Sequence, residues 1–162
     1  MLIVLEVVTA ILVGVAMALS LAHALELPGK MRLPREEYLA VQPIYYPGFT
    51  IGGAAEPLGL IGIGALLIMI PGGDARFWLH AGALAALGTS HLLFWTMTQP
   101  SNRYWLEYRQ LTGAAKLFFG TGRTGAPGSD WQQQRNRWER SHLLRAIASM
   151  LAFILVLVAI AL

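Results

Sequence analysis

Four long apolar stretches constrain this chain more than any other feature of its sequence. They cover about residues 2–25, 49–70, 76–98 and 142–162. Each is long enough for a helix that crosses a hydrocarbon core, which takes about 20 residues. Only 13% of the residues are charged, about half the share of an ordinary soluble domain. The sequence therefore predicts an all-α integral membrane protein with one four-helix transmembrane domain over residues 1–162.

The connection between the second and third stretches is a short turn, Pro71-Gly72-Gly73-Asp74. Helices joined by so short a turn pack as antiparallel neighbours, so we expect an antiparallel four-helix bundle. The first stretch has one alternative, a cleaved signal peptide ending at Ala22-His23-Ala24. A signal peptide has a basic n-region, whereas this stretch has Glu6 there. We therefore favour a transmembrane helix.

The basic residues indicate how the four helices are oriented. Eleven of the twelve Lys and Arg residues lie in the two long connections or at the start of the fourth stretch, and Arg76 alone lies on the other side. By the positive-inside rule, both long connections are cytoplasmic and both termini lie on the outer, periplasmic side of the inner membrane. Because these residues flank apolar segments, the pI of about 9.6 indicates a lipid bilayer as partner and no nucleic acid. The absence of cysteine excludes disulfides and thiolate metal sites.

The cytoplasmic loop 99–141 contains predicted structure of its own. Residues 101–116 have the pattern of an amphipathic loop helix at the membrane interface. Ser129, with Gln132 three residues later, forms a predicted capping box. We therefore expect the fourth helix to begin early, near Asp130, and to continue into the membrane.

Small and polar residues follow one face of the first helix at helical spacing. They are Glu6, Thr9, Val13, Ala16, Ser20 and His23. Packing against a neighbouring helix accounts for Thr9, Ala16 and Ser20. We expect Glu6 to be solvated near the outer surface, and His80 to be an interface residue near the same surface.

Each of the four helices also brings an ionisable residue to a common depth in the cytoplasmic half. These residues are His23, Glu56, His91, and His142 with Arg145. At 1.5 Å per residue they fall within about 10 Å of depth. Any one of them can be a satisfied polar contact between helices, but ionisable groups at membrane depth are expensive and most often functional. The convergence of the set favours a functional site.

The residue types leave the chemistry of that site open. His23, Glu56, His91 and His142 are ligand types for zinc, iron or copper, and two histidines from facing helices can ligate haem iron. Without a cofactor, the same groups can bind a quinone or phenolate and move its proton. Because the spacing distinguishes none of these, the cofactor is unknown: none, or a transition metal or haem bound by histidines.

Several short motifs resemble the anthrone oxygenase-like family of small four-helix membrane proteins, many of which have no known function. The run from Leu21 to Lys30 (LAHALELPGK), YYPGFT at 45–50 and AEP at 55–57 carry the first part of the resemblance. QPSN at 99–102, followed by Trp105, and WERSHLLR at 138–145 carry the second part. The resemblance covers nearly the whole chain.

The resemblance implies oxygenation of a flat phenolic anthrone without metal or flavin. His142 or His23 is then the base, and Arg145 or Asn102 holds the oxyanion. Trp105, with Glu56 and His91, lines the expected substrate pocket. The chain is closer to the bacterial branch of unknown function than to the polyketide enzymes, so the substrate itself does not carry over.

Three functions follow from the sequence. The first is a membrane oxidoreductase, oxygenase-like, acting on a hydrophobic aromatic or quinone-like small molecule. The second is a metal- or haem-binding protein in electron transfer. The third is a structural accessory subunit, since four helices and a basic loop suffice to brace a larger membrane complex. Both a homo-oligomer and a larger complex stay open, and the lack of inverted repeats disfavours a transporter.

Overall fold

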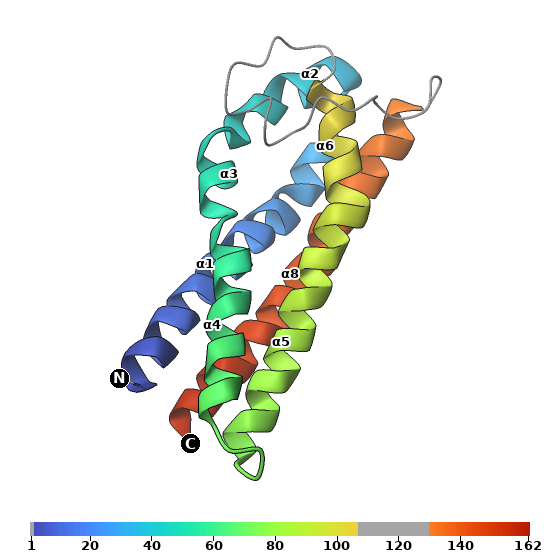
Figure 1. Cartoon of the computed structure of the whole chain (residues 1–162). Coiled ribbons are helices and arrows are strands. Elements are labelled where there is room, and N and C mark those ends of the chain that lie inside the picture. The colour runs from blue at the N-terminus through green and yellow to red at the C-terminus, as the bar shows by residue number, and fades with distance from the viewer. Residues whose placement is uncertain (1, 107–129) are drawn as a thin grey trace.

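Helices make up the secondary structure of residues 2–106 and 130–162, the parts of the chain that this computed structural model describes (Figure 1). No strand occurs within these two ranges. In chain order the elements are α1 (Leu2–Lys30), α2 (Arg35–Val41), the 3₁₀ helix η1 (Gln42–Tyr45), α3 (Gly48–Gly52), α4 (Ala55–Met69), α5 (Ala75–Leu93), the π-helix η2 (Phe94–Thr98), α6 (Gln99–Leu106) and α8 (Trp131–Ala161).

Four helical segments are long and apolar enough to cross a membrane: Leu2–Lys30, Gly48–Met69, Ala75–Asn102 and Trp131–Ala161. The distribution of side chains agrees with a lipid environment. Large apolar residues such as Ile11, Ile61 and Ile68 are exposed, whereas many polar residues are buried between the helices. Exposed apolar surface of this extent is typical of contact with lipid. The chain is a multi-pass membrane protein.

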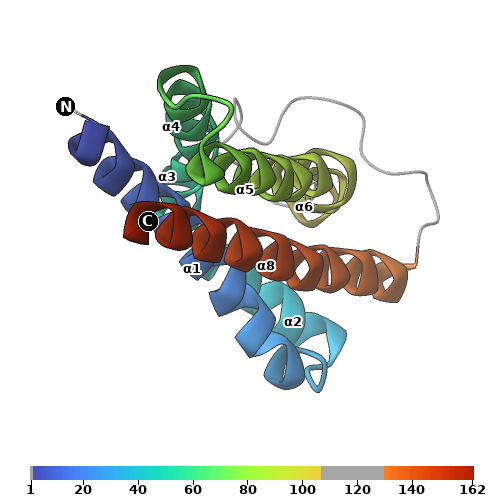
Figure 2. The ribbon, with the colours of Figure 1, turned by 90° about the horizontal axis from the view of Figure 1, so that it is seen from below.

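The four long helices lie side by side, with α8 packed against α1 and α5, and α4 packed against the same two helices. Both termini and the turn between α4 and α5 lie at one end of the molecule (Figure 1). The segment that carries α2, and α6, lie at the other end. The view from below shows α5 and α8 running alongside each other, with α1 crossing behind α8 (Figure 2).

The polar stripe predicted on the first helix is buried. Its six members, Glu6, Thr9, Val13, Ala16, Ser20 and His23, together with Lys30, are the buried residues of α1. The expectation that Glu6 is solvated is wrong, since its exposure is only 5%. His80 is likewise fully buried. Glu6 lies on the same face of α1 as the other buried residues, so it points into the interior of the bundle with them.

The helix ends differ from the predicted bounds in physically understandable ways. α1 continues to Lys30 through Pro28, and Lys30 at its end contacts Glu139 of α8. The predicted helix 49–70 is divided into α3 and α4 by a two-residue turn at Gly53 and Ala54. The predicted helix 76–98 continues through the π-helix η2 into α6.

The fourth helix begins at Trp131, which confirms the early start predicted near Asp130. Its N-cap is Asp130, whose carboxylate accepts a hydrogen bond from the Gln132 backbone N–H at 3.0 Å. The predicted cap Ser129 lies outside the described residues. Of the predicted loop helix 101–116, residues 101–106 are helical in α6 and the remainder lies outside the described residues.

Candidate functional site

The five predicted ionisable residues fall into two adjoining groups, which we name the imidazole pair and the Glu56 network. His23 and His142 form the imidazole pair, with ring centroids 4.0 Å apart. Glu56, His91 and Arg145 belong to the Glu56 network. Arg145 lies close enough to both imidazoles to act on them electrostatically. The sequence analysis treated the five residues as one set and did not predict this division.

Aromatic rings surround the imidazole pair. The ring of Tyr45 lies 4.4 Å from that of His23, and the ring of Phe49 lies 4.7 Å from it. Trp138 lies edge-on to His142 at 4.3 Å, one helical turn before it on α8. His23 and His142 are only 5% and 4% exposed. The pair is therefore packed inside an aromatic box made by these three rings.

His142 has an unusual hydrogen-bonding state for a buried polar side chain. Neither of its ring nitrogens has a hydrogen-bond partner among the described residues, and the same holds for Nδ1 of His23. A buried polar group without a partner costs about 1–3 kcal/mol. Buried polar atoms in native proteins are nearly always paired. An unpaired imidazole at this depth therefore points to a group that reacts or binds.

A second layer of charges closes the imidazole pair toward the end that carries α2 and α6. Lys30 lies 3.2 Å from Glu139 and 3.4 Å from Glu26, with its ammonium 4.7 Å from the Trp138 ring. Tyr38 donates a hydrogen bond to Glu139 at 2.9 Å. These contacts hold α1, α2 and α8 together around a lysine that is itself buried.

Tyr45 completes this layer by donating a hydrogen bond of 2.6 Å to Glu26. Burial, and then the neighbouring Glu139 carboxylate, raise the pKa of the Tyr38 phenol far above its usual range. Burial, and then the hydrogen bond to Glu26, raise the pKa of Tyr45 in the same way. Both phenols therefore keep their protons at neutral pH and act as hydrogen-bond donors to carboxylates.

In the Glu56 network, one buried carboxylate joins three helices. Glu56 lies in the first turn of α4 and is 3% exposed. Its Oε1 lies 2.9 Å from His91 Nδ1, and its Oε2 accepts from Arg145 at 2.8 Å and from Ser90 at 3.2 Å. A carboxylate with a guanidinium partner and additional donors is the form in which a buried charge is tolerated.

The geometry also fixes the tautomer of neutral His91. The Trp95 indole N–H donates to His91 Nε2 at 3.0 Å, so Nε2 is an acceptor and Nδ1 carries the proton toward Glu56. Trp95 is 52% exposed, and it lies in the π-helix η2, a distortion that often occurs at functional sites. The network therefore runs from an exposed indole to the buried Glu56–Arg145 pair.

Asn102 makes its hydrogen bonds to Gln99 and Trp138 and not to the ring nitrogens of His142. The Asn102 amide oxygen accepts from the Trp138 indole N–H at 2.8 Å, so Asn102 contacts the pair only through that ring. The backbone of Trp105 belongs to α6, but its side chain lies outside the described residues. The Asn102 amide thus orients Trp138, and its role in holding an oxyanion stays a prediction.

The proposed metal ligands do not form one set. Within residues 2–106 and 130–162, no group of three or more His, Asp or Glu side chains is arranged to hold a metal ion. His91 and Glu56 are satisfied by each other, Trp95 and Arg145. The His23 and His142 rings are in direct contact, which leaves no room between them for a haem. The residues present fit neither a tetrahedral metal site nor bis-histidine haem ligation.

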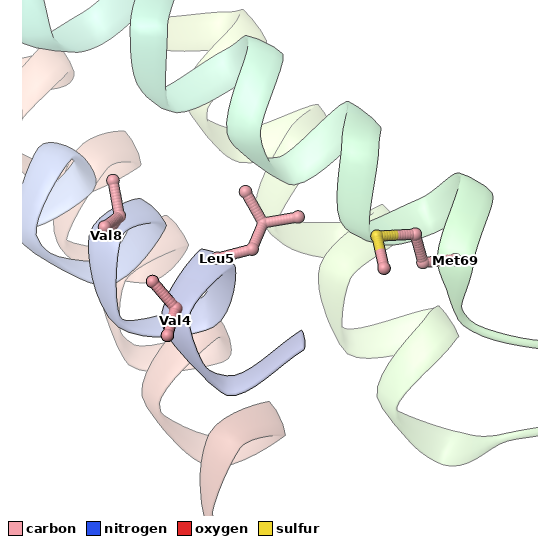
Figure 3. Close-up of a pocket in the computed structure, with 4 residues that line it drawn as sticks. All are labelled: Val4, Leu5, Val8 and Met69. Carbon is pink, nitrogen blue, oxygen red and sulfur yellow. The ribbon is translucent and has the colours of Figure 1, made fainter. Parts of the chain in front are cut away.

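A surface groove of about 460 Å³ lies elsewhere, lined by Val4, Leu5, Val8 and Met69 (Figure 3). These residues lie on α1 and at the end of α4, near the termini, and those of α1 lie about 22–28 Å along the helix from His23. The lining is entirely apolar. The groove therefore offers contact to lipid chains but no group for chemistry.

Several residues of the site were not singled out from the sequence. They are Lys30, Tyr38, Tyr45, Trp95, Trp138 and Glu139. Helical spacing contains a signal for two of them, since Lys30 lies seven residues after His23 and Trp138 four before His142. Tyr38 and Tyr45 belong to the α2–η1 segment, for which no sequence rule gives a position.

Comparisons with family models, with curated proteins and with solved structures find no match to this chain.

Proposed function

We propose that this protein is an inner-membrane, antiparallel four-helix oxidoreductase, oxygenase-like, that acts on a hydrophobic aromatic or quinone-like molecule. Both termini lie on the outer side, and the reactive groups lie in the cytoplasmic half. The excess of Lys and Arg in the two long connections supports this orientation. The imidazole pair is the reactive centre, and the Glu56 network supports it.

One observation carries the proposal: His142 is buried, and neither of its ring nitrogens has a partner among the described residues. A neutral imidazole in this state can accept a proton from a phenol or an activated C–H group. Arg145, three residues further along α8, offsets the negative charge that the substrate then gains. The aromatic box of Tyr45, Phe49 and Trp138 suits a flat ring system.

The chemistry needs no resident cofactor when dioxygen is the oxidant. His142 removes a proton from the ring carbon opposite the carbonyl of an anthrone, and the resulting carbanion transfers electrons to dioxygen and gives a peroxide anion. Protonated His142 returns its proton to this anion, which forms a hydroperoxide. The O–O bond then breaks as the remaining hydrogen of that carbon leaves with the hydroxyl group as water, and a second ring carbonyl results. An anthrone and dioxygen thus give an anthraquinone and water. The substrate carbon is oxidised, and dioxygen is reduced.

A hydrophobic substrate reaches such a site from the lipid. His91 has a side chain that is 34% exposed, and Trp95 beside it is 52% exposed. Polar groups that face lipid are expensive, so this edge of α5 suits a ligand with its own polar atoms. A substrate that enters from the lipid beside Trp95 brings its ring carbonyl or phenol to the Glu56 network.

The test is turnover in lipid nanodiscs, measured as dioxygen uptake with anthrone as the probe and anthraquinone absorbance as the product. We expect His142→Phe to lower the rate by at least about 100-fold, the usual contribution of a general base. Thr89→Val, on the exposed face of α5, is the matched control and should keep the wild-type rate. Full turnover in His142→Phe would refute His142 as the base.

A structural accessory role is the second candidate, and the pairing within the Glu56 network favours it. Each oxygen of Glu56 already has a partner on another helix, which suffices to hold the helices together. A stable larger complex after purification, with neither turnover nor binding of phenols and quinones, would support this role. Elemental analysis and a visible spectrum of the same preparation test the metal and haem alternative directly.

A further inference from the structure

Three buried polar side chains lie in the half of the bundle that carries the termini, far from the residues used above. Glu6 is 5% exposed, and Thr9 and His80 are fully buried. Glu6 Oε1, Thr9 Oγ1 and His80 Nε2 have no hydrogen-bond partner among the described residues. Each such atom is costly in an apolar interior, and three of them in one region of the fold require a common explanation.

Helix geometry brings these side chains to one level. Val13 of α1 and Leu87 of α5 meet above Gly59, each 3.3 Å from the position a Cβ on Gly59 would take. Glu6 lies seven residues before Val13, and His80 lies seven residues before Leu87. Seven residues are two turns, about 10 Å along each helix, and return to nearly the same face. Glu6 and His80 therefore both point into the interior about two helical turns closer to the termini than Val13 and Leu87.

Thr9 lies between these levels and on the same face of α1 as Glu6. Its Oγ1 is close to α4, since a Cβ on Gly62 would lie only 2.5 Å from it. Unlike Ser20, whose hydroxyl donates to the Ala16 carbonyl, Thr9 makes no such bond within its helix. Its hydroxyl is therefore available to a group in the interior.

The donor and acceptor roles are complementary. His80 Nδ1 lies 2.7 Å from the Arg76 carbonyl oxygen, which can only accept, so Nδ1 carries the proton and Nε2 of the neutral ring is an acceptor. Glu6 Oε1 of the carboxylate is also an acceptor, and the Thr9 hydroxyl can donate. One water molecule can satisfy all three groups, because its two protons can be donated to the two acceptors and one of its lone pairs can accept from the donor.

No neighbouring side chain among the described residues donates a hydrogen bond to Glu6 Oε1 or His80 Nε2, so a small molecule is the remaining donor. Arg76 acts on Glu6 electrostatically, but its guanidinium makes its hydrogen bonds to Asp74, at 2.6 and 3.0 Å. The buried residues that α4 and α8 contribute toward this end are apolar, among them Leu66 and Val156. Among the described residues, no other side chain supplies the donor that Glu6 and His80 require.

We propose that Glu6, Thr9 and His80 bind a single internal water molecule in the half of the bundle that carries the termini. The water donates to Glu6 Oε1 and His80 Nε2 and accepts from the Thr9 hydroxyl. Three hydrogen bonds are typical of a buried water. The site is independent of the imidazole pair.

The experiment is water-edited solid-state NMR of the full chain in lipid bilayers, with ¹⁵N-labelled histidine and His80 assigned through His80→Gln. We expect His80 Nε2 to show the shift of an unprotonated nitrogen and to receive magnetisation from water. Thr9→Val keeps the shape but removes the donor, and should lower this transfer at least about two-fold because one of three hydrogen bonds is lost. Thr89→Val, on the exposed face, should leave it unchanged.

Two results would overturn the site. The first is a wild-type His80 without water transfer, or with transfer that Thr9→Val does not reduce. The second is a His80 signal that shifts when ammonium chloride replaces sodium chloride, since an ammonium ion also donates to Glu6 and His80. In that case the occupant is a cation and not water.

Discussion

Glu56 receives hydrogen bonds from side chains on α5 and α8, and Arg145 is the only one of these donors with a permanent charge. Removing Arg145 therefore leaves a buried carboxylate without its counter-ion. We expect Arg145→Met to lower the free energy of unfolding by about 3–5 kcal/mol, the usual cost of breaking a buried pair from one side. Thermal or denaturant unfolding in detergent measures the change.

The double variant Glu56→Gln with Arg145→Met supplies the control for this pair. It removes both charges, so we expect a smaller loss than the two single variants add up to. Strict additivity would show that the two residues do not interact. In the double variant the amide oxygen of the substituted Glu56 side chain can still accept from His91 or Ser90, so the change in stability reports mainly the loss of the two charges.

The buried phenol of Tyr38 predicts a particular dependence of stability on pH. Its native pKa is raised, mainly by burial, while in the unfolded chain it ionises near pH 10. Stability is therefore fully present below about pH 10 and is lost as pH rises toward the native pKa, at up to about 1.4 kcal/mol per pH unit. Unfolding free energies measured between about pH 8 and about pH 12 test this.

Tyr38→Phe should reduce the alkaline slope, because the substituted ring has no proton to lose, and Tyr45, whose pKa is also raised by burial, accounts for the slope that remains. At neutral pH the same variant should be less stable by about 1–3 kcal/mol, since Glu139 loses a hydrogen bond. Tyr46→Phe is the matched control, because Tyr46 is 39% exposed, and we expect it to keep the wild-type slope. An unchanged slope in Tyr38→Phe would contradict the assignment.

At the scale of elements, glycines determine how closely α1 and α4 approach. A Cβ on Gly62 would lie 2.5 Å from Thr9 Oγ1, whereas a Cβ on Gly64 meets nothing within 4 Å. We expect Gly62→Ala to cost about 1–3 kcal/mol, as overpacking does. Gly64→Ala on the same helix should be neutral or stabilise by up to about 1 kcal/mol. Unfolding of the two variants side by side makes the comparison.

Combining Gly62→Ala with Thr9→Ala tests the origin of the cost. The smaller side chain removes the atoms that the new Cβ would meet, so the double variant should recover part of the lost stability. Equal losses in Gly62→Ala and Gly64→Ala would instead mean that α1 and α4 adjust freely, and that the close approach at Gly62 does not limit packing.

The long helices and the buried face of α1 were predictable because both follow from local patterns. Length and apolarity define a membrane span, and the spacing from Glu6 to His23 defines a face. The burial of Glu6 itself was not predicted, since hydropathy places a carboxylate near the end of a span in water. The packing of α4 and α8 against α1 closes this face.

The candidate site was predicted in its residues but not in its pairing. Spacing along each helix places His23, Glu56, His91 and His142 at similar depths, yet it does not fix how the helices are rotated about one another. Rotation decides that His142 meets His23 while Glu56 meets Arg145 and His91. The contributions of Tyr38 and Tyr45 depend on the fold of the α2–η1 segment, which has no periodic pattern.

At the scale of the whole molecule, the proposed orientation in the membrane can be tested by labelling single introduced cysteines. The sequence contains no cysteine, so single cysteines can be labelled without background. Gly73, in the exposed turn between α4 and α5, has open space around it. Glu36, in the first turn of α2, is exposed at the opposite end. These two positions report on the two sides of the membrane.

We expect a membrane-impermeant maleimide to label Gly73→Cys in intact spheroplasts and to label Glu36→Cys only after the membrane is permeabilised. The reason is the concentration of Lys and Arg in the two long connections, which retains them on the cytoplasmic side. The reverse pattern would invert the protein and place the imidazole pair in the outer half. Labelling of both positions in intact spheroplasts would mean that the helices between them do not separate two compartments, and the membrane-spanning arrangement itself would have to be abandoned.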